Sequence, residues 1–362
     1  MKTAIIHDAF LHIGGAEKVF LELVDLYPEA DIYIPIINKN LLYLIEKKTK
    51  GNIYSSFLSK LSFFYRYASI FKPLLIFYWE NLNLKKYKII ITSSHSFNSK
   101  LVNTTKETTH ISYVYTPPRY LSKHFNEIRF LKNSLIRILL FPLLRWLKKK
   151  DYQSGQKPTL IISISKTIQN RIWNTYNRKS LVIYPPVNLS QLITKKGKGK
   201  YYLCFSRLAK QKGISLAVKT CTKLQLPLIV VGTGSELGNL KKIAGPTIVF
   251  KGFIKDEELE EIFINTKAMI NCAIEEDFGM VTIEAASRGI PTIGYNSGGL
   301  KETIIKNKTG IFFDEHTVES LSEALIKFEK KSFDSKDCYN FSRKFSTKIF
   351  RMKMKKLIEY YK

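Results

Sequence analysis

Two glutamates, Glu276 and Glu284, are separated by seven residues in a stretch with the pattern of a strand, a loop and a helix. The apolar run 268–274 is typical of a short buried strand, and the helix-forming residues that follow end near Gly289. The start of a helix presents unpaired N–H groups and a partial positive charge, which together suit a phosphate. Gly279 has no Cβ that would keep a ligand away from this backbone. The stretch therefore predicts a diphosphate site at Gly279, Met280 and Val281, and Phe278, which with Gly279 opens the helix, is a further candidate for donor binding.

The two carboxylates flank this predicted phosphate position. Carboxylate oxygens accept hydrogen bonds from hydroxyl groups, so Glu276 is a candidate for holding a sugar and Glu284 for holding a ribose. A simpler interpretation is a solvated acidic turn followed by a glutamate on a helix surface. For an isolated pair that simpler interpretation would be preferred. Here the Phe-Gly between the glutamates and the Glu-Ala-Ala-x-x-Gly-x-Pro pattern after them favour binding.

Two basic residues, Arg207 and Lys212, lie in one loop after the predicted strand Tyr202–Ser206. Arginine binds phosphate through two parallel hydrogen bonds, whereas lysine acts as a point charge. In a chain with a formal net charge of +28, two basic loop residues also fit an ordinary solvated surface. With the sugar-binding carboxylate, the candidate catalytic residues are Arg207, Lys212 and Glu276.

A second glycine loop, Gly14-Gly15, follows the predicted strand Thr3–Asp8 and precedes a helix with apolar residues at helical spacing. Strand, glycine loop and helix form another potential phosphate cradle. A Gly-Gly pair is a weak signal by itself, and a simple turn would explain it equally well.

Together these motifs resemble the retaining glycosyltransferases of family 4, which have the GT-B fold. The resemblance covers nearly the full length and is strongest from Tyr201 to Phe313. It implies two Rossmann-like domains facing each other across a cleft, a nucleotide-sugar donor, no cofactor and no obligatory metal. It also implies that Arg207 and Lys212 neutralise the leaving diphosphate, that Phe253 lies near the nucleotide base and that Gly14 and Gly15 face the donor. Further matching segments are Val231–Gly234, Lys251–Ile254 and Asn296–Glu302.

Three segments of the first half look like the branch that includes bacterial GDP-mannose-dependent mannosyltransferases of surface-polysaccharide assembly: Ser93–Phe97, Tyr115–Tyr120 and Tyr184–Asn188. This branch implies GDP-mannose as the donor and a glycan or lipid-linked acceptor. Two positions depart from it: Tyr115 replaces a histidine expected to contact the transferred sugar, and Asn188 replaces an aspartate. The candidates for contacting the sugar or the acceptor are therefore His7, His95 and Tyr115.

The composition, with 45% hydrophobic residues, is that of a folded protein with substantial cores, and the length of 362 residues suggests about two or three domains. Predicted strands alternate with helical segments, including a helix capped by Ser165, and indicate doubly wound parallel sheets. We expect an N-terminal domain over 1–190, a linker at 195–200, a C-terminal domain over 200–340 and a basic helix over 341–362 that returns to the first domain. The four cysteines are expected to be reduced structural thiols. The sequence contains no signal-peptide pattern and no apolar run long enough to span a membrane, which favours a cytoplasmic protein.

Two segments rich in large apolar side chains, 57–79 and 130–147, also carry scattered basic residues. On a helix, Arg137, Arg145, Lys148 and Lys149 share an arc of roughly 120°, a pattern that suits peripheral binding to an anionic membrane. Packing of these helices on the sheet is an equally good interpretation, and Pro142 is expected to kink the second helix. No nucleic-acid-binding motif is present. The alternative to an enzyme is a non-catalytic module that binds anionic lipid or nucleic acid through its basic surface.

Overall fold

The structure, a computed structural model, describes residues 2–60, 72–95, 98–119, 139–190, 192 and 199–361. The chain divides into two compact units, which are described separately: unit 1 is Met1–Tyr184 with Arg351–Lys362, and unit 2 is Pro185–Phe350. Several features named above lie outside the described residues: Ser96, Phe97, Tyr120, Arg137 and most of the predicted linker.

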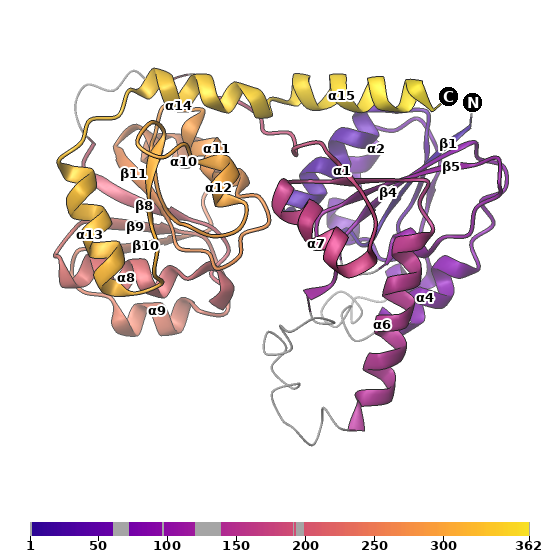
Figure 1. The fold of residues 1–362 in the computed structure, drawn as a ribbon, viewed down its shortest axis with the longest axis horizontal. Coiled ribbons are helices and arrows are strands. Elements are labelled where there is room, and N and C mark those ends of the chain that lie inside the picture. Colours follow the sequence, from indigo (N-terminus) through magenta and orange to yellow (C-terminus); the bar gives the residue numbers. More distant parts are fainter. Residues whose placement is uncertain are drawn as a thin grey trace. The chain divides into compact units, whose positions relative to one another are not determined.

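Unit 1 contains a seven-stranded parallel sheet with the order β3-β2-β1-β4-β5-β6-β7 (Figure 1). The strands are β1 (Thr3–His7), β2 (Asp31–Tyr33), β3 (Ile53–Tyr54), β4 (Ile89–Ser94), β5 (Thr109–Val114), β6 (Leu160–Ser163) and β7 (Leu181–Val182). The described helices of this unit are α1 (Gly15–Leu26), α2 (Tyr43–Glu46), α4 (Lys72–Glu80), α6 (Phe141–Gln156) and α7 (Lys166–Tyr176), with 3-10 turns at Lys39–Leu41, Phe57–Lys60 and Ser99–Leu101.

The two apolar segments, 57–79 and 130–147, contribute to the core of unit 1. Trp79 of α4 and Leu147 of α6 are buried in one cluster with Ile6 and Ile90 of the sheet. The described parts of both segments therefore pack on the sheet, which is one of the two interpretations given above. Pro142 lies in the first turn of α6, where its missing N–H leaves no hydrogen bond unmade; residues 130–138, which precede it in the predicted helix, lie outside the described residues.

Unit 2 contains a six-stranded parallel sheet with the order β10-β9-β8-β11-β12-β13. Its strands are β8 (Tyr201–Phe205), β9 (Leu228–Val231), β10 (Ile248–Gly252), β11 (Thr266–Asn271), β12 (Thr292–Tyr295) and β13 (Gly310–Phe313). Its helices are α8 (Ile214–Lys223), α9 (Leu237–Ile243), α10 (Asp256–Ile264), α11 (Met280–Ala286), α12 (Leu300–Thr303), α13 (Val318–Glu329) and α14 (Ser335–Ser342), with 3-10 turns at Lys210–Lys212 and Arg343–Phe345.

Both faces of the unit 2 sheet are covered, as the alternation along β8 shows. Tyr202 and Cys204 join one buried cluster with α8 and α13, whereas Leu203 joins another with Phe263 of α10 and Ala285 of α11 (Figure 1). A parallel sheet with helices on both faces requires strands that are apolar throughout, and these strands have that composition. The prediction of two Rossmann-like α/β domains is therefore confirmed.

The predicted strands Thr3–Asp8 and Tyr202–Ser206 agree with β1 and β8 to within one residue at each end, and the Ser165 cap is confirmed because its side chain accepts from the N–H of Ile168 at 3.1 Å. Strand β3 was not predicted. Strand β11 ends at Asn271, not at Ile274. The Asn271 side chain accepts from the N–H of Ala273, and the N–H of Ile274 donates to the carbonyl of Gln211, so the backbone leaves the sheet.

The last helix, α15 (Thr347–Tyr360), begins later than the expected residue 341, because residues before it form α14 and a 3-10 turn around the buried Phe345. Arg351 pairs with Glu22 and Asp25 of α1, and its Nε lies 2.9 Å from Glu22 Oε2. The four cysteines are free and buried, as predicted. Within the described ranges, no helix combines the length and hydropathy needed to cross a membrane.

Candidate functional site

The central strands of the unit 2 sheet are β8 and β11, where the strand order changes direction. Ligands of open α/β sheets bind outside the carboxyl ends of the strands at such a point. The loop after β8 carries Arg207 and Lys212, and the loop after β11 carries Glu276. The topology therefore brings these two loops to one edge of the sheet.

An ion pair joins the two loops. Lys212 Nζ donates to both carboxylate oxygens of Glu276, at 3.0 and 2.8 Å. The backbones are also joined, since the N–H of Ile274 donates to the carbonyl of Gln211 at 3.0 Å. The pair lines a small pocket of about 10 Å³ together with Ser206, Asn271 and Val281.

Gly213 explains why the loop after β8 can approach the loop after β11 so closely. Its φ is +62°, and a Cβ at this position would lie 2.1 Å from the carbonyl oxygen of Cys272. The glycine thus places Lys212 beside Glu276. Gly298 has a similar role on the other side of the loop, because its Cβ would lie 2.5 Å from the carbonyl oxygen of Glu276. The Gly-Gly-x-x-Glu segment therefore supports the carboxylate loop.

Backbone hydrogen bonds on either side fix the main chain of Arg207, whereas its side chain is exposed. The flanking N–H groups of Ser206 and Leu208 donate to carbonyls of Val231 and Thr233, at 3.1 and 2.8 Å. The guanidinium forms no ion pair with any residue that the structure describes. The backbone thus places an exposed positive group next to Ser206, which lines the pocket.

The other predicted donor-binding residues occupy different environments. Helix α11 begins at Met280, and Gly279 caps it in a left-handed conformation (φ +95°). Glu284 lies half-buried one turn inside this helix. Phe278 is buried and packs against Phe345, so its ring belongs to the core. Phe253, after β10, is 84% exposed.

Ser206 and Asn271 line the pocket but were missed in the sequence. Each is the polar residue that ends an apolar strand or follows it directly. That position was a usable signal, because the carboxyl ends of parallel strands carry the site.

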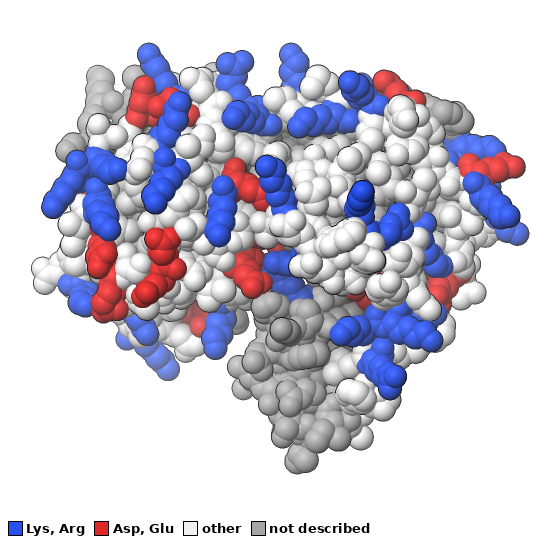
Figure 2. All heavy atoms as spheres, viewed as in Figure 1, with Lys and Arg blue, Asp and Glu red and all other residues white. Residues whose placement is uncertain are grey.

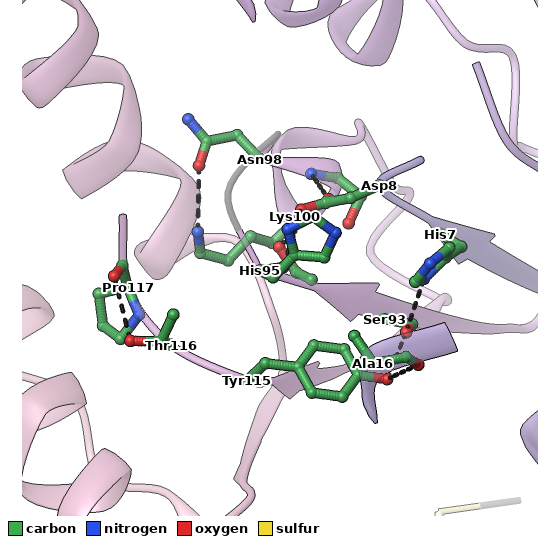
Figure 3. A network of polar contacts seen from close by, with 12 residues as sticks. His7, Asp8, Ala16, Ser93, His95, Asn98, Lys100, Tyr115, Thr116 and Pro117 are labelled. Atoms are coloured by element: carbon green, nitrogen blue, oxygen red, sulfur yellow. Dashed lines mark hydrogen bonds and ion pairs between the residues drawn. The ribbon is translucent and has the colours of Figure 1, made fainter. Parts of the chain in front are cut away.

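In unit 1 the strand order changes direction between β1 and β4, and a buried polar network lies at their carboxyl ends (Figure 3). His7 Nδ1 lies 2.9 Å from Ser93 Oγ. The Tyr115 hydroxyl lies 2.8 Å from the same oxygen and donates to the carbonyl of Ala16 at 2.9 Å. Burial raises the pKa of Tyr115, so its hydroxyl stays protonated, and burial lowers the pKa of His7 to about 3.

Asp8 ties the loop after β4 to β1. Its carboxylate accepts from the backbone N–H groups of His95, at 2.7 Å, and Ser99, at 2.8 Å. Gly14 caps α1, and its N–H donates to Glu17 Oε2 at 3.0 Å. His110 is buried on β5 and pairs with Thr92, within the sheet and away from its carboxyl edge.

Comparison with known families gives one match: residues 188–345 match the family described as "Glycosyl transferases group 1". Residues 188–345 form a group 1 glycosyltransferase domain. The matched range contains Arg207, Lys212, Glu276 and Glu284, so every predicted donor-binding residue of unit 2 lies inside this group 1 domain.

Curated relatives match parts of the chain. A GDP-mannose-dependent alpha-(1-6)-phosphatidylinositol monomannoside mannosyltransferase of Mycobacterium tuberculosis is 29% identical over 148 residues, which are 36% of this chain and 38% of that protein. An uncharacterized glycosyltransferase of Methanocaldococcus jannaschii is 24% identical over 277 residues, 68% of this chain and 67% of that one. The chain thus spans about two fifths of the length of the mycobacterial enzyme.

Solved structures extend the likeness of the fold beyond the group 1 domain. HepE of Anabaena, solved in complex with UDP, has a TM-score of 0.71 at 14% identity, covering 99% of this chain and 100% of its own. The lipopolysaccharide outer core galactosyltransferase WaaB has a TM-score of 0.68 at 16% identity, with 99% of each chain covered. These neighbours are GT-B glycosyltransferases, so the GT-B prediction is confirmed.

Proposed function

We propose that the protein is a retaining hexosyltransferase that transfers mannose from GDP-mannose to an acceptor hydroxyl, with no metal ion required at the diphosphate. The observation that carries the proposal is the contact between Lys212 and Glu276 at the edge of the unit 2 sheet. One side chain suits a phosphate and the other suits sugar hydroxyls. In a group 1 glycosyltransferase domain, a cation and a carboxylate at this place fit a nucleotide-sugar.

The proposed mechanism assigns one task to each group. As the bond between the sugar and the diphosphate breaks, negative charge grows on the leaving diphosphate, and Arg207 and Lys212 stabilise it. Glu276 holds the sugar hydroxyls and Glu284 the ribose, while Phe253 lies beside the base. The acceptor attacks from the face that the diphosphate leaves, which retains the configuration of the sugar.

Donor binding would exchange the ion pair for new partners. Lys212 would turn to the diphosphate and Glu276 to the sugar, so neither charge would be left without a partner. Both side chains are partly exposed, at 27% and 14%, which keeps the cost of this exchange modest. The pair therefore holds both side chains near the ligand position before the donor arrives.

For unit 1, the proposed contacts to the sugar or the acceptor are His7, His95, Tyr115 and the Gly14-Gly15 loop. The Tyr115 hydroxyl already has two partners, Ser93 and Ala16. His95 is only partly buried, with 23% of its side chain exposed. We therefore expect His95, not Tyr115, to make the direct contact that a histidine makes in the similar branch.

A donor-hydrolysis screen tests the proposal. The full chain is incubated with GDP- and UDP-linked mannose, glucose, galactose and N-acetylglucosamine, and release of the nucleoside diphosphate is measured. Release from GDP-mannose above all other donors is expected. Release from a UDP-sugar instead would support the proposed transfer reaction and would replace GDP-mannose as its donor.

The alternative is a non-catalytic module that binds anionic lipid or nucleic acid. Figure 2 shows Lys and Arg side chains scattered over the visible face among acidic ones, which does not favour one long anionic polymer. If no donor releases a nucleoside diphosphate and the chain still binds anionic lipid, the non-catalytic module would be favoured.

A lipid-linked acceptor would place the enzyme at the cytoplasmic face of a membrane. Leu139, which precedes α6, and Phe141 and Leu143 in its first turn are exposed, and the next turns expose Arg145, Lys148 and Lys149. Each basic residue near an anionic surface contributes about 1 kcal/mol. The triple variant of Arg145, Lys148 and Lys149 to Gln should co-sediment less with anionic liposomes. The matched triple variant of Lys219, Lys241 and Lys242 to Gln, in unit 2, should bind them as the parent does.

A further inference from the structure

Three ligand-type side chains converge at the point where the strand order changes in unit 1. They are His7 at the end of β1, Glu17 in the first turn of α1 and His95 after β4. One imidazole nitrogen of each histidine and one carboxylate oxygen of Glu17 all lie within 4.8 Å of one another. His7 is fully buried and Glu17 is 5% exposed, so two of the three groups are removed from water.

His7 Nε2 is a buried polar atom with no hydrogen-bond partner. A buried polar atom left in this state destabilises the fold. Bulk water does not reach it, because the side chain is fully buried and its ring stacks on Phe20 at 4.4 Å. Nε2 therefore lacks a partner that a bound ligand, held also by the neighbouring side chains, would supply.

The proton arrangement in the network assigns a lone pair to this nitrogen (Figure 3). The carbonyl of Ala16 can only accept, so the Tyr115 hydroxyl uses its single proton there. Ser93 must then donate its own proton to the Tyr115 oxygen, and its oxygen is left to accept from His7 Nδ1. His7 is thus the tautomer with the proton on Nδ1, and Nε2 carries the lone pair that binds a metal ion.

The groups behind the ligands also follow the pattern of metal sites. A ligating histidine usually directs its other ring nitrogen at a carboxylate, carbonyl or similar partner, which fixes the ring. Ser93 does this for His7. Asp8 lies behind His95, with Oδ2 3.8 Å from Nδ1. The Gly14 N–H fixes the carboxylate of Glu17.

We propose that His7, Glu17 and His95 bind a divalent transition-metal ion, with Zn²⁺ as the best fit. Two imidazoles and one carboxylate are a typical zinc ligand set that leaves a fourth position open, with bonds of about 2.0–2.2 Å. Imidazole ligands disfavour Mg²⁺ and Ca²⁺, which take oxygen ligands. The site belongs wholly to unit 1, whereas the groups proposed for the diphosphate all belong to unit 2. Its ligands His7 and His95 are also the residues proposed above to contact the sugar or the acceptor, so an ion bound here would take the place of their direct contact.

The test uses the untagged full chain, treated with EDTA and desalted, and measures Zn²⁺ binding by calorimetry. One ion per chain is expected, and Co²⁺ in its place should give the visible absorption of a four-coordinate site. Glu17→Gln and His95→Gln should each weaken Zn²⁺ binding by at least about tenfold, and Ser93→Ala by about tenfold. His316→Asn, in unit 2, is the matched control and should bind like the parent.

Two outcomes would overturn the site. One is a parent chain that binds no Zn²⁺ at one ion per chain. The other is unchanged affinity in both Glu17→Gln and His95→Gln, each with the parent's circular dichroism spectrum. Neither donor nor acceptor enters the experiment, so failure here and failure of the transferase proposal are separate results.

Discussion

The two sheets share a strand order and differ in what lies at the point where that order changes. In unit 2, the loops after β8 and β11 meet through an ion pair between partly exposed side chains, Lys212 and Glu276. In unit 1, the ends of β1 and β4 meet through fully buried groups, namely the His7 imidazole, the Ser93 hydroxyl and the Asp8 carboxylate. The first site has charges that can change partners, whereas the second has a rigid network with one lone pair left over.

The comparison indicates how one topology serves two kinds of ligand. Partly solvated charges of opposite sign suit a charged ligand that arrives and leaves, because water lowers the cost of exchanging partners. Buried hydroxyls and imidazoles suit a group that stays, because a fully connected buried network holds its members in one geometry. The same carboxyl edge therefore fits transient binding in unit 2 and fixed positioning in unit 1.

The largest expected effect is on the charged edge of unit 2. Lys212→Ala should lower turnover at saturating donor by roughly 10²–10³-fold, because the growing charge on the diphosphate loses a stabilising group. The matched control is Lys210→Ala, which removes an exposed lysine from the same 3-10 turn. Release of nucleoside diphosphate is measured for both. Equal rates for the two variants would remove Lys212 from the mechanism.

The next effect concerns the glycine that brings the two loops together. Gly213→Ala places a Cβ 2.1 Å from a backbone oxygen and keeps a left-handed conformation, so the free energy of unfolding should fall by roughly 2–3 kcal/mol. Gly238→Ala in α9 meets no atom within 4 Å and should stabilise the chain by about 0.5–1 kcal/mol. Urea unfolding measures both. A Gly213→Ala chain as stable as the parent would mean that the loops do not need this close approach.

The sequence predicted the charged edge of unit 2 more completely than the buried network of unit 1. Arg207, Lys212 and Glu276 stand in short local patterns of glycine and charge, which report the loops that carry them. The partners of His7 lie 86 residues away, so no local pattern shows that its Nδ1 is used and its Nε2 is not. Strand β3 was missed because its two residues give no alternation to detect. The end of β11 was missed because an asparagine side chain turns the backbone.

Acid should lower the stability of unit 1 through a buried histidine, His110. Burial, together with the nearby Lys157, lowers the pKa of His110 to about 3, below its usual value near 6.5. The unfolded chain therefore binds this proton more readily, and the stability that the neutral ring provides is complete above pH 6.5 and is lost as the pH falls toward 3. The free energy of unfolding should fall by about 1.4 kcal/mol per pH unit from this residue alone.

Urea unfolding at pH 7, 6 and 5, in buffer with EDTA, measures this slope. His110→Gln should make the slope shallower. A parent slope that His110→Gln leaves unchanged would show that acid acts elsewhere.

The smallest expected effect tests whether the unit 1 network acts as a connected set. The Tyr115 hydroxyl has two partners, Ser93 and Ala16, whereas the hydroxyl of Tyr113, which is also buried, donates to the carbonyl of Ile183 at 2.9 Å. Each lost hydrogen bond in a buried place costs about 1 kcal/mol. Tyr113→Phe should therefore cost about 1 kcal/mol and Tyr115→Phe about 2 kcal/mol, since the second change removes two hydrogen bonds, one to the Ala16 carbonyl and one to the Ser93 hydroxyl. Both variants keep the ring, so packing is preserved and urea unfolding reports the hydroxyl. Equal losses would mean that the Tyr115–Ser93 contact adds nothing, and the fixed tautomer of His7 would lose its support.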